Sequence, residues 1–312
     1  MKRREFMQYC LASAAFNTYQ PNQMSSLNNA FQIIQNNLFP NPPSFSFDDL
    51  LRENNIDPVF FSTPVLMNNT NAAFKESLRV TSWNIEWAKH LEDILNAFDY
   101  VRELKETDIF LIQEVPIEYI EKLARNYNYA FGINYYTLKE DKTLGVGLGD
   151  MILSRYTIRD PKIIRLPMGY DHFTDNRRIG TPIALKTDIS GIDIYCTHFE
   201  MKTSPEYRKK EMKSLIDSLD TEKVIIGGDF NVLWNSNERS IQLALDNEFI
   251  DPIGLTHKPT VNREDAHYTR LLGLSTATLD RILSRNMTVR NHRILSEVAI
   301  SDHYPVTVEY LL

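Results

Sequence analysis

The chain lacks the cysteines for a disulfide framework, and it lacks an apolar run long enough to span a bilayer. Its only cysteines are Cys10 and Cys196, and the apolar strand pattern around Cys196 predicts an inert, buried thiol. Basic residues are outnumbered, with 34 lysines and arginines against 41 acidic residues and a formal net charge of -7. A protein that binds nucleic acid over a broad basic surface needs the opposite balance. An enzyme that contacts a few phosphates beside a metal ion is compatible with this charge.

The composition of the 312 residues, 43% hydrophobic and 24% charged, is ordinary for a folded protein of one large domain or two small ones. Residues 1–16 combine basic residues at 2–4, a short apolar stretch and small residues at 12–14, and they resemble a twin-arginine export signal. We therefore expect an exported protein, periplasmic or secreted, and a frayed cytosolic N-terminus is the alternative. Residues 17–75 are rich in Asn, Pro and Ser, which predicts an N-terminal extension that lies partly on the domain or is partly disordered.

From residue 76 to residue 312, short apolar runs alternate with amphipathic stretches, which predicts one α/β domain without internal repeats. Helical spacing of apolar residues predicts helices over 91–104, 117–123 and 205–219. Short apolar runs predict strands at 79–83, 108–112, 151–153, 182–185, 192–196, 224–226, 278–283 and 305–310.

The run Val224-Ile225-Ile226 is followed by two glycines and then by an acid and an amide, Asp229 and Asn231. Residues i and i+2 of an extended backbone point to the same side, so both side chains are expected where a buried strand ends. A carboxylate is an anionic oxygen ligand, and an amide offers both a donor and an acceptor. The pair suits a divalent cation beside a phosphate, and an Asx-rich turn after a core strand is the alternative.

Further acids, amides and histidines follow other predicted strands. Ligands gather at strand ends in α/β folds, so these positions predict one shared cleft. Taken singly, each has an ordinary explanation as a turn, a helix start or a surface histidine. The positions are Asn84 and Glu86, Gln113 and Glu114, His198, Asp280, and Asp302 and His303.

The ordered set resembles the endonuclease/exonuclease/phosphatase superfamily, which includes deoxyribonuclease I, over residues 78–312. The resemblance implies a four-layer αββα sandwich of two packed mixed β-sheets, deoxyribonuclease I-like, with the active site along one rim. It also implies hydrolysis of a phosphoester with Mg²⁺, or with Mn²⁺ as the alternative. The motifs that carry it are Trp83-Asn84-Ile85, Gln113-Glu114, Thr197-His198-Phe199, Gly228-Asp229-Phe230-Asn231, Leu279-Asp280 and Ser301-Asp302-His303.

The same resemblance assigns the metal to three oxygen donors. Glu114 is the principal ligand, Asn84 lies beside it, and Asp302 shares the same ion or holds a second one. Arg177 and Arg178 precede the strand that leads towards His198, and they are candidates for holding the substrate phosphate because a guanidinium matches phosphate geometry. A solvated loop pair is the alternative for these two arginines.

The chemistry is assigned by resemblance to the remaining residues. Asp229 positions or deprotonates the attacking water, and Asn231 donates its amide to a phosphate oxygen. His198 and His303 contact the phosphate and stabilise the charge that builds on its oxygens. Asp280 forms a hydrogen bond with His303 and favours the protonated imidazole.

One position departs from the family pattern. The segment 149–155 resembles a further family block, but Asp150 stands where many members carry an amide or a small apolar residue. Whether Asp150 adds a ligand or only changes a turn stays open at this point.

The substrate also stays open. A nuclease-type phosphodiesterase, with nucleic acid as substrate, is the first hypothesis. Asp280-Arg281-Ile282-Leu283 matches part of the signature of inositol-phosphate phosphatases, and residues 271–274 are a candidate membrane-contacting loop of a sphingomyelinase-like phospholipid hydrolase. A non-catalytic binding module is the third hypothesis, although this chain keeps both histidines and Glu114. No obligate protein partner is indicated.

Overall fold

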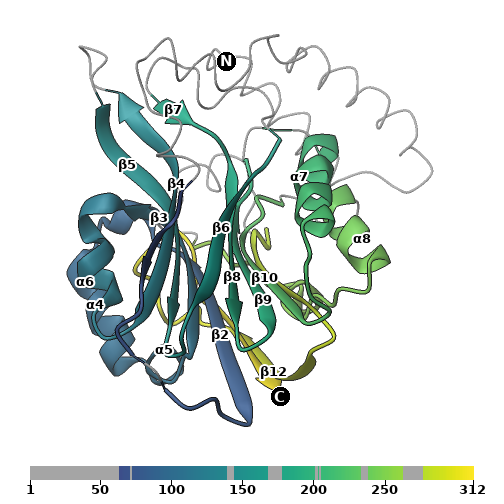
Figure 1. Cartoon of the computed structure of the whole chain (residues 1–312), viewed down its shortest axis with the longest axis horizontal. Helices are drawn as coiled ribbons and strands as arrows, with labels where there is room; N and C mark the ends of the chain where they lie inside the picture. Colours follow the sequence, from purple (N-terminus) through teal and green to yellow (C-terminus); the bar gives the residue numbers. More distant parts are fainter. Residues whose placement is uncertain are drawn as a thin grey trace.

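Two β-sheets pack face to face, and helices cover the outer face of each sheet (Figure 1). This arrangement is the four-layer sandwich that the family resemblance implied. The computed structural model describes residues 63–70, 72–138, 144–167, 178–200, 203, 205–232, 238–262 and 277–312.

The larger sheet contains eight strands in the order β1-β4-β5-β3-β2-β13-β12, and β7 pairs with β4. The neighbours β2 and β3 are parallel, and the other pairs of this sheet are antiparallel. The strands are β1 (Val65–Met67), β2 (Ser77–Asn84), β3 (Ile109–Pro116), β4 (Asn128–Leu138), β5 (Leu144–Ser154), β7 (Arg178–Gly180), β12 (Thr288–Ile294) and β13 (Val306–Leu311).

The smaller sheet contains five strands in the order β11-β10-β9-β8-β6, with β9 and β10 parallel. A Cβ atom at Gly228 would collide with the backbone carbonyl of Thr197, so only glycine allows β10 to lie this close to β9 beside the predicted cleft. The strands are β6 (Arg159–Arg165), β8 (Ile183–Ile189), β9 (Ile192–His198), β10 (Val224–Asp229) and β11 (Asp280–Arg285).

Helices α4 (Leu91–Tyr100), α5 (Arg102–Lys105) and α6 (Ile120–Ala124) cover the larger sheet, whereas α7 (Pro205–Asp217) and α8 (Arg239–Asp246) cover the smaller one (Figure 1). Among the described residues, the large apolar clusters lie between the sheets and under each helical layer. Burial of these clusters is the main favourable contribution to folding. Short 3₁₀ turns complete the structure at η3 (Glu86–Ala88), η4 (Ile117–Tyr119) and η5 (Gly254–Thr256).

The predicted helix over 91–104 is two helices in the structure. Val101 has an extended backbone (φ -80°, ψ 118°), and it ends α4 and precedes α5. Its apolar side chain still packs against the cluster under the helices. The apolar residues therefore keep helical spacing from α4 to α5, although the helix itself is interrupted at Val101.

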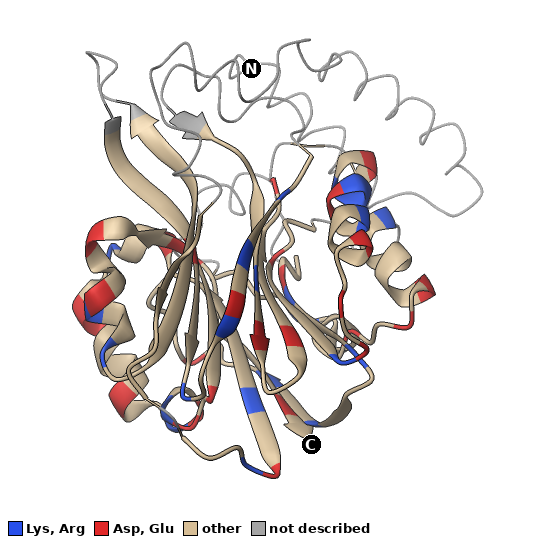
Figure 2. Cartoon of the chain, in the orientation of Figure 1, with Lys and Arg blue, Asp and Glu red and all other residues tan. Residues whose placement is uncertain are grey.

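The sequence did not predict β1, β4, β6, β7, β12 or α8. Two of these strands, β6 and β12, lie at sheet edges and carry mostly polar, partly exposed residues. Figure 2 shows acidic and basic residues intermingled along β6. Charged residues on an edge strand disfavour pairing with other chains. Such a strand lacks the alternation of apolar and polar residues from which strands are predicted. Strand β1 belongs to residues 17–75 and pairs with β4, so this part of the predicted extension lies on the domain.

Several predictions fall outside the described residues: the export signal of residues 1–16, Arg177, and the candidate membrane loop at 271–274. Within the described part of the chain, no helix combines the length and apolar character needed to cross a bilayer.

Candidate active site

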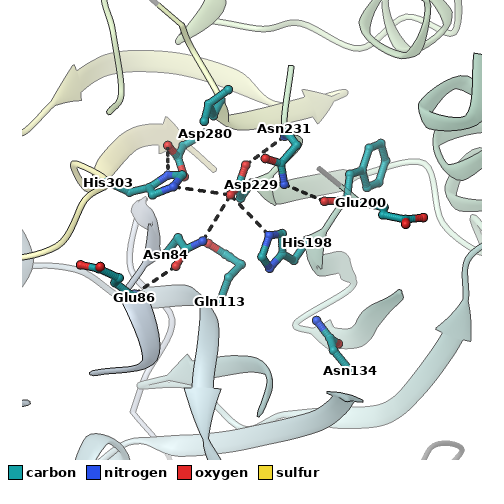
Figure 3. A network of polar contacts seen from close by, with 12 residues as sticks. Asn84, Glu86, Gln113, Asn134, His198, Glu200, Asp229, Asn231, Asp280 and His303 are labelled. Carbon is teal, nitrogen blue, oxygen red and sulfur yellow. Dashed lines mark hydrogen bonds and ion pairs between the residues drawn. The ribbon is translucent and has the colours of Figure 1, made fainter. Parts of the chain in front are cut away.

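The carboxylate of Asp229 lies at the centre of a buried polar cluster where β2, β9 and β10 end (Figure 3). Its Oδ2 accepts a hydrogen bond from Nδ2 of Asn84 at 3.2 Å. The same oxygen lies 3.5 Å from Nε2 of His198 and 3.7 Å from Nε2 of His303. Asp229 is 2% exposed, so its charge interacts with these groups in a low-dielectric setting. One amide and two imidazoles therefore surround a single carboxylate oxygen, Oδ2 of Asp229.

His303 is held from several sides. Its Nδ1 lies 2.8 Å from Oδ2 of Asp280, and its backbone carbonyl accepts a hydrogen bond from Nε1 of Trp83 at 3.0 Å. Burial lowers the pKa of His303, but the carboxylates of Asp280, Asp229 and Asp302 outweigh burial and raise it well above its ordinary value. The geometry thus favours a protonated imidazole that presents Nε2 to the cluster.

Two further acids adjoin the cluster: Oδ1 of Asp302 lies 4.0 Å from Nε2 of His303, and Glu114 interacts electrostatically with both histidines. Burial raises the pKa of Glu114, the His198 imidazole lowers it, and the charge of Asp302 raises it further. The Asn84 side chain forms a hydrogen bond with Glu114, and its Oδ1 accepts one from the backbone N–H of Glu86 at 3.1 Å. Asn84 thus turns its nitrogen towards Asp229 in this structure, and its oxygen is engaged by the backbone.

Asn231 follows Asp229 in a tight turn. Its φ of 50° is left-handed, and its backbone N–H donates to Oδ1 of Asp229 at 2.9 Å. The extended spacing predicted for this pair is therefore wrong, because the strand ends at Asp229 and an Asx turn begins there. The side-chain Nδ2 of Asn231 donates to the carbonyl of Phe199 at 2.7 Å, which ties this turn to the residue after His198.

A second polar layer lies behind the cluster, between the sheets. Asp150 in β5 is fully buried, accepts a hydrogen bond from Nδ2 of Asn134 at 3.2 Å, and leaves Oδ2 without a partner among the described residues. Burial raises the pKa of Asp150 to about 7, although His198 and Asn134 both lower it. Figure 3 shows the Asn134 amide pointing towards the side of the cluster where His198 lies. Asp150 therefore belongs to a strand and not to a turn.

A buried ionic network supports the segment that follows His198. Arg208 is 1% exposed and pairs with Glu238, with 3.0 Å between Nη2 and Oε2, and its Nη1 donates to the carbonyl of Thr203 at 2.9 Å. Oε1 of Glu211 accepts a hydrogen bond from the backbone N–H of Glu200 at 3.2 Å. The network holds the Phe199–Glu200 segment, and so it supports both His198 and the partner of Asn231.

The structure brings together all eight residues that the sequence assigned to catalysis and metal binding. Cys196 is a buried free thiol, as expected. The backbone of Arg178 forms part of β7, and Arg177 lies outside the described residues. No sequence pattern assigned a role to Asn134, which lies in the unpredicted strand β4. The alternating run of Tyr129, Phe131 and Ile133 could have indicated that strand.

Comparison with known proteins identifies the family. The sequence model of the Endonuclease/Exonuclease/phosphatase family matches residues 81–303, which span the cluster from Asn84 to His303. The chain belongs to this family. Phosphoester hydrolysis is the general activity of its members, and divalent-metal dependence is general among them. No curated protein matches the chain.

Solved structures of family members share the fold. The endonuclease/exonuclease/phosphatase from Beutenbergia cavernae has a TM-score of 0.58 and 16% identity, over 76% of this chain and 72% of that one. The human Nocturnin catalytic domain has a TM-score of 0.56 and 18% identity, over 81% and 98% of the two chains. A Bacteroides thetaiotaomicron mannosyl-6-phosphatase has a TM-score of 0.55 and 15% identity, over 75% and 100%. At these identities the likeness establishes the fold alone.

Proposed function

We propose that this family member is a divalent-metal-dependent phosphodiesterase of nuclease type that uses an activated water. The observation that carries the proposal is the position of Asp229, whose Oδ2 lies 3.5 Å from Nε2 of His198 and 3.7 Å from Nε2 of His303. A carboxylate between two imidazoles can orient a water and accept its proton, while the imidazoles face the phosphate oxygens.

The residues present fit a hard divalent cation. Glu114 and Asp302 are carboxylates close enough to raise the pKa of Glu114 by mutual repulsion, and Asn84 contacts Glu114. Carboxylate and amide oxygens are the ligands that Mg²⁺ takes in enzymes that bind phosphate. Glu114 and Asp302 would hold the ion, and the Asn84 oxygen would join them if its amide rotated. A cation bound there polarises a phosphoryl oxygen and offsets charge that develops on the phosphate.

Each of the remaining site residues has a separate role in the proposed hydrolysis. Asp229 holds the attacking water and takes up its proton. The protonated imidazole of His303 donates a hydrogen bond from Nε2 to a phosphate oxygen, because Asp280 occupies Nδ1. His198 contacts the phosphate from the other side of Asp229. Asn231 keeps the Asp229 carboxylate in place through its backbone N–H, and it would reach a phosphate oxygen only by releasing the Phe199 carbonyl.

The purified chain with bis(4-nitrophenyl) phosphate and 4-nitrophenyl phosphate tests the proposal. We expect Mg²⁺ or Mn²⁺ to support release of 4-nitrophenol from the diester, with the monoester cleaved more slowly and EDTA abolishing both reactions. Preference for the monoester would favour a phosphatase of sugar, inositol or lipid phosphates instead. Failure with these esters and with DNA, RNA and phospholipid would favour a non-catalytic binding module.

Substitutions test the individual roles. We expect Glu114→Ala, Asp229→Ala and His303→Ala each to abolish turnover while the circular dichroism spectrum stays native. Unimpaired activity in any one of them would contradict the role given to that residue.

A further inference from the structure

A single peptide unit joins the turn at Asn231 to a buried helix. The carbonyl of Phe199 and the N–H of Glu200 belong to the same trans peptide, so they lie in one plane and point in opposite directions. The carbonyl accepts a hydrogen bond from Nδ2 of Asn231 at 2.7 Å, and the N–H donates to Oε1 of Glu211 at 3.2 Å. A change at either end of this peptide therefore acts on the other end through a rigid group.

Phe199 contacts the whole segment that carries Asp229. Figure 3 shows Asn231 between Asp229 and the segment that carries Glu200. The N–H of Phe199 donates to the carbonyl of Asp229 at 2.8 Å, and its ring packs edge-on against Phe230 with 5.0 Å between ring centroids. The position of Phe199 therefore helps to determine the position of the turn.

The turn holds the carboxylate of Asp229. The left-handed φ of Asn231, 50°, directs its backbone N–H to Oδ1 of Asp229 at 2.9 Å. Asn tolerates this conformation better than most residues, and its side-chain bond to the Phe199 carbonyl holds it there. Oδ2 of the same carboxylate faces His198 and His303, so its direction depends on how firmly Oδ1 is held.

The other end of the peptide is attached to a rigid element. Glu211 lies in α7, and Arg208, three residues earlier, pairs with Glu238 just before α8, with 3.0 Å between Nη2 and Oε2. This buried ion pair joins the two helices. A side chain that is held on a packed helix positions its partner more precisely than a side chain on a loop does.

Glu211 is an unexpected residue for its position. It is 1% exposed on the buried face of α7, next to Met212 and one turn before Leu215. An apolar residue would pack there without loss, whereas a carboxyl must give up its hydration. Burial and the charge of Glu200 raise the pKa of Glu211 well above its ordinary value, so the acid lowers stability at neutral pH. Stability therefore does not explain an acid at this position, whereas a role in the active site does.

We propose that Glu211 is a positioning residue for the Asp229 carboxylate, which it holds in its catalytic orientation through the Phe199–Glu200 peptide and the Asn231 turn. The inference rests on the proposed role of Asp229 in hydrolysis, and it adds a residue of α7 to the site. The bond from the N–H to Glu211 fixes the direction of the Phe199 carbonyl and polarises it, which makes it a stronger acceptor for Asn231.

Two substitutions at residue 211 separate this role from a contribution to folding. Glu211→Gln keeps an oxygen for the Glu200 N–H, whereas Glu211→Leu fills the space without an acceptor. On bis(4-nitrophenyl) phosphate, we expect Glu211→Leu to lower kcat about tenfold to 100-fold with KM within about twofold of wild type, because displacing a catalytic group affects the transition state most. Glu211→Gln should keep kcat within about twofold of wild type.

Met212→Ala is the matched control for packing. Met212 is the next residue of α7 and is fully buried, so its truncation should lower the urea midpoint while kcat stays at the wild-type value. Glu211→Met, which is similar in length and only a weak acceptor, repeats the comparison if Glu211→Leu is unfolded by circular dichroism. A fall in kcat of the same size in Met212→Ala would overturn the proposal.

A double variant tests the route through Asn231. If Glu211 acts through this turn, Glu211→Leu should lower kcat little further when Asn231→Ala is already present. Losses that simply add would mean that Glu211 acts by another route, and the proposal would be wrong.

Nuclear magnetic resonance gives a readout that needs no turnover. In the full chain labelled with [15N]asparagine, the side-chain amide signals of Asn231 are assigned by their loss in Asn231→Ala. We expect these signals to keep their positions in Glu211→Gln and to move towards those of a solvated amide in Glu211→Leu. Signals that stay in place in Glu211→Leu would contradict the link.

The outcomes separate this inference from the proposed function. If the wild type cleaves the diester and Glu211→Leu keeps the wild-type kcat and KM, the positioning role is wrong and the proposed function stands. If Glu211→Leu instead lowers KM at constant kcat, Asn231 acts by leaving the Phe199 carbonyl for the phosphate, which also overturns the role. If the wild type cleaves no ester with any metal, the proposed function fails, and the Asn231 signals still decide whether Glu211 holds the turn.

Discussion

Nδ1 of His303 lies 2.8 Å from Oδ2 of Asp280, although the two residues are 23 positions apart in the chain. Asp280 begins β11, and its backbone pairs directly with that of Asp229 at the end of β10. The antiparallel pairing of these strands thus brings an orienting acid and a water-activating acid to the same end of the smaller sheet. The imidazole of His303 lies between the two carboxylates.

The first prediction concerns this pair. Asp280→Asn keeps the shape of the side chain but removes the charge that holds His303 in its protonated form. We expect kcat on a diester to fall about 100-fold or more, with a smaller change in KM, because the imidazole acts mainly on charge that develops in the transition state. Steady-state kinetics measure both constants, and Asp217→Asn on the exposed face of α7 is the control. Equal kcat in Asp280→Asn and wild type would contradict the role of the pair.

The second prediction concerns the metal. Glu114→Gln removes a carboxylate whose pKa is already raised by burial and by Asp302. We expect the Mg²⁺ concentration for half-maximal activity to rise at least about tenfold, because a neutral amide is a weaker ligand than a carboxylate. Calorimetric titration with Mg²⁺ gives the same comparison without substrate, and Glu92→Gln on α4 is the matched control. An unchanged metal requirement would place the ion elsewhere, for example among Asp229, Asp280 and His303, which also lie close enough to share one.

The sequence predicted which residues would form the site better than it predicted the strands of the two sheets. Asn84, Asp229 and His303 were expected to converge because each adjoins an apolar strand, and strand ends meet at one rim. The resemblance to the family supplied the pairing of the two sheets, which local patterns cannot determine. The Asp280–His303 contact was expected on the same basis.

What the sequence missed has physical causes. The edge strands β6 and β12 bury few residues, so no alternation marks them. The left-handed conformations of Glu86, Glu114 and Asn231 were not expected, because none of these residues is glycine. Asn231 is held by a long-range contact, the hydrogen bond of its side chain with the Phe199 carbonyl, which no local pattern indicates. The buried contact between Asn134 and Asp150 depends on the pairing of β4 with β5, which the sequence did not predict.

The third prediction concerns Glu211, which is 1% exposed. Burial and the charge of Glu200 raise its pKa well above the ordinary value, although the backbone of Glu200 and the Arg208 guanidinium lower it. The folded state therefore binds a proton that the unfolded state releases above about pH 4.5. The free energy of unfolding should fall as pH rises from there through the folded-state pKa.

Glu211→Gln should abolish this fall in the free energy of unfolding at higher pH. The amide keeps an oxygen for the Glu200 N–H and carries no charge, so we expect the variant to resist urea better than the wild type at pH 7 and to match it near pH 4.5. Urea unfolding at several pH values measures the difference, and Glu206→Gln, exposed at the start of α7, is the control. A variant that is less stable than the wild type at pH 7 would mean that the ionised carboxylate stabilises the network.

The last prediction concerns Asp150, whose pKa is raised to about 7 by burial between the sheets. The unfolded chain releases this proton near pH 3.8, so the folded state holds the extra proton between about pH 4 and pH 7. The free energy of unfolding should therefore fall by up to about 1.4 kcal/mol for each pH unit across that window. Asp150→Asn removes the titrating group and keeps Oδ1 as an acceptor for Asn134. We expect the variant to be a few kcal/mol more stable than the wild type at pH 7.5 in EDTA, and equal to it near pH 4. If the wild type instead gains stability from pH 4 to pH 7 and the variant does not, then Asp150 is ionised in the folded protein and its charge is used by His198.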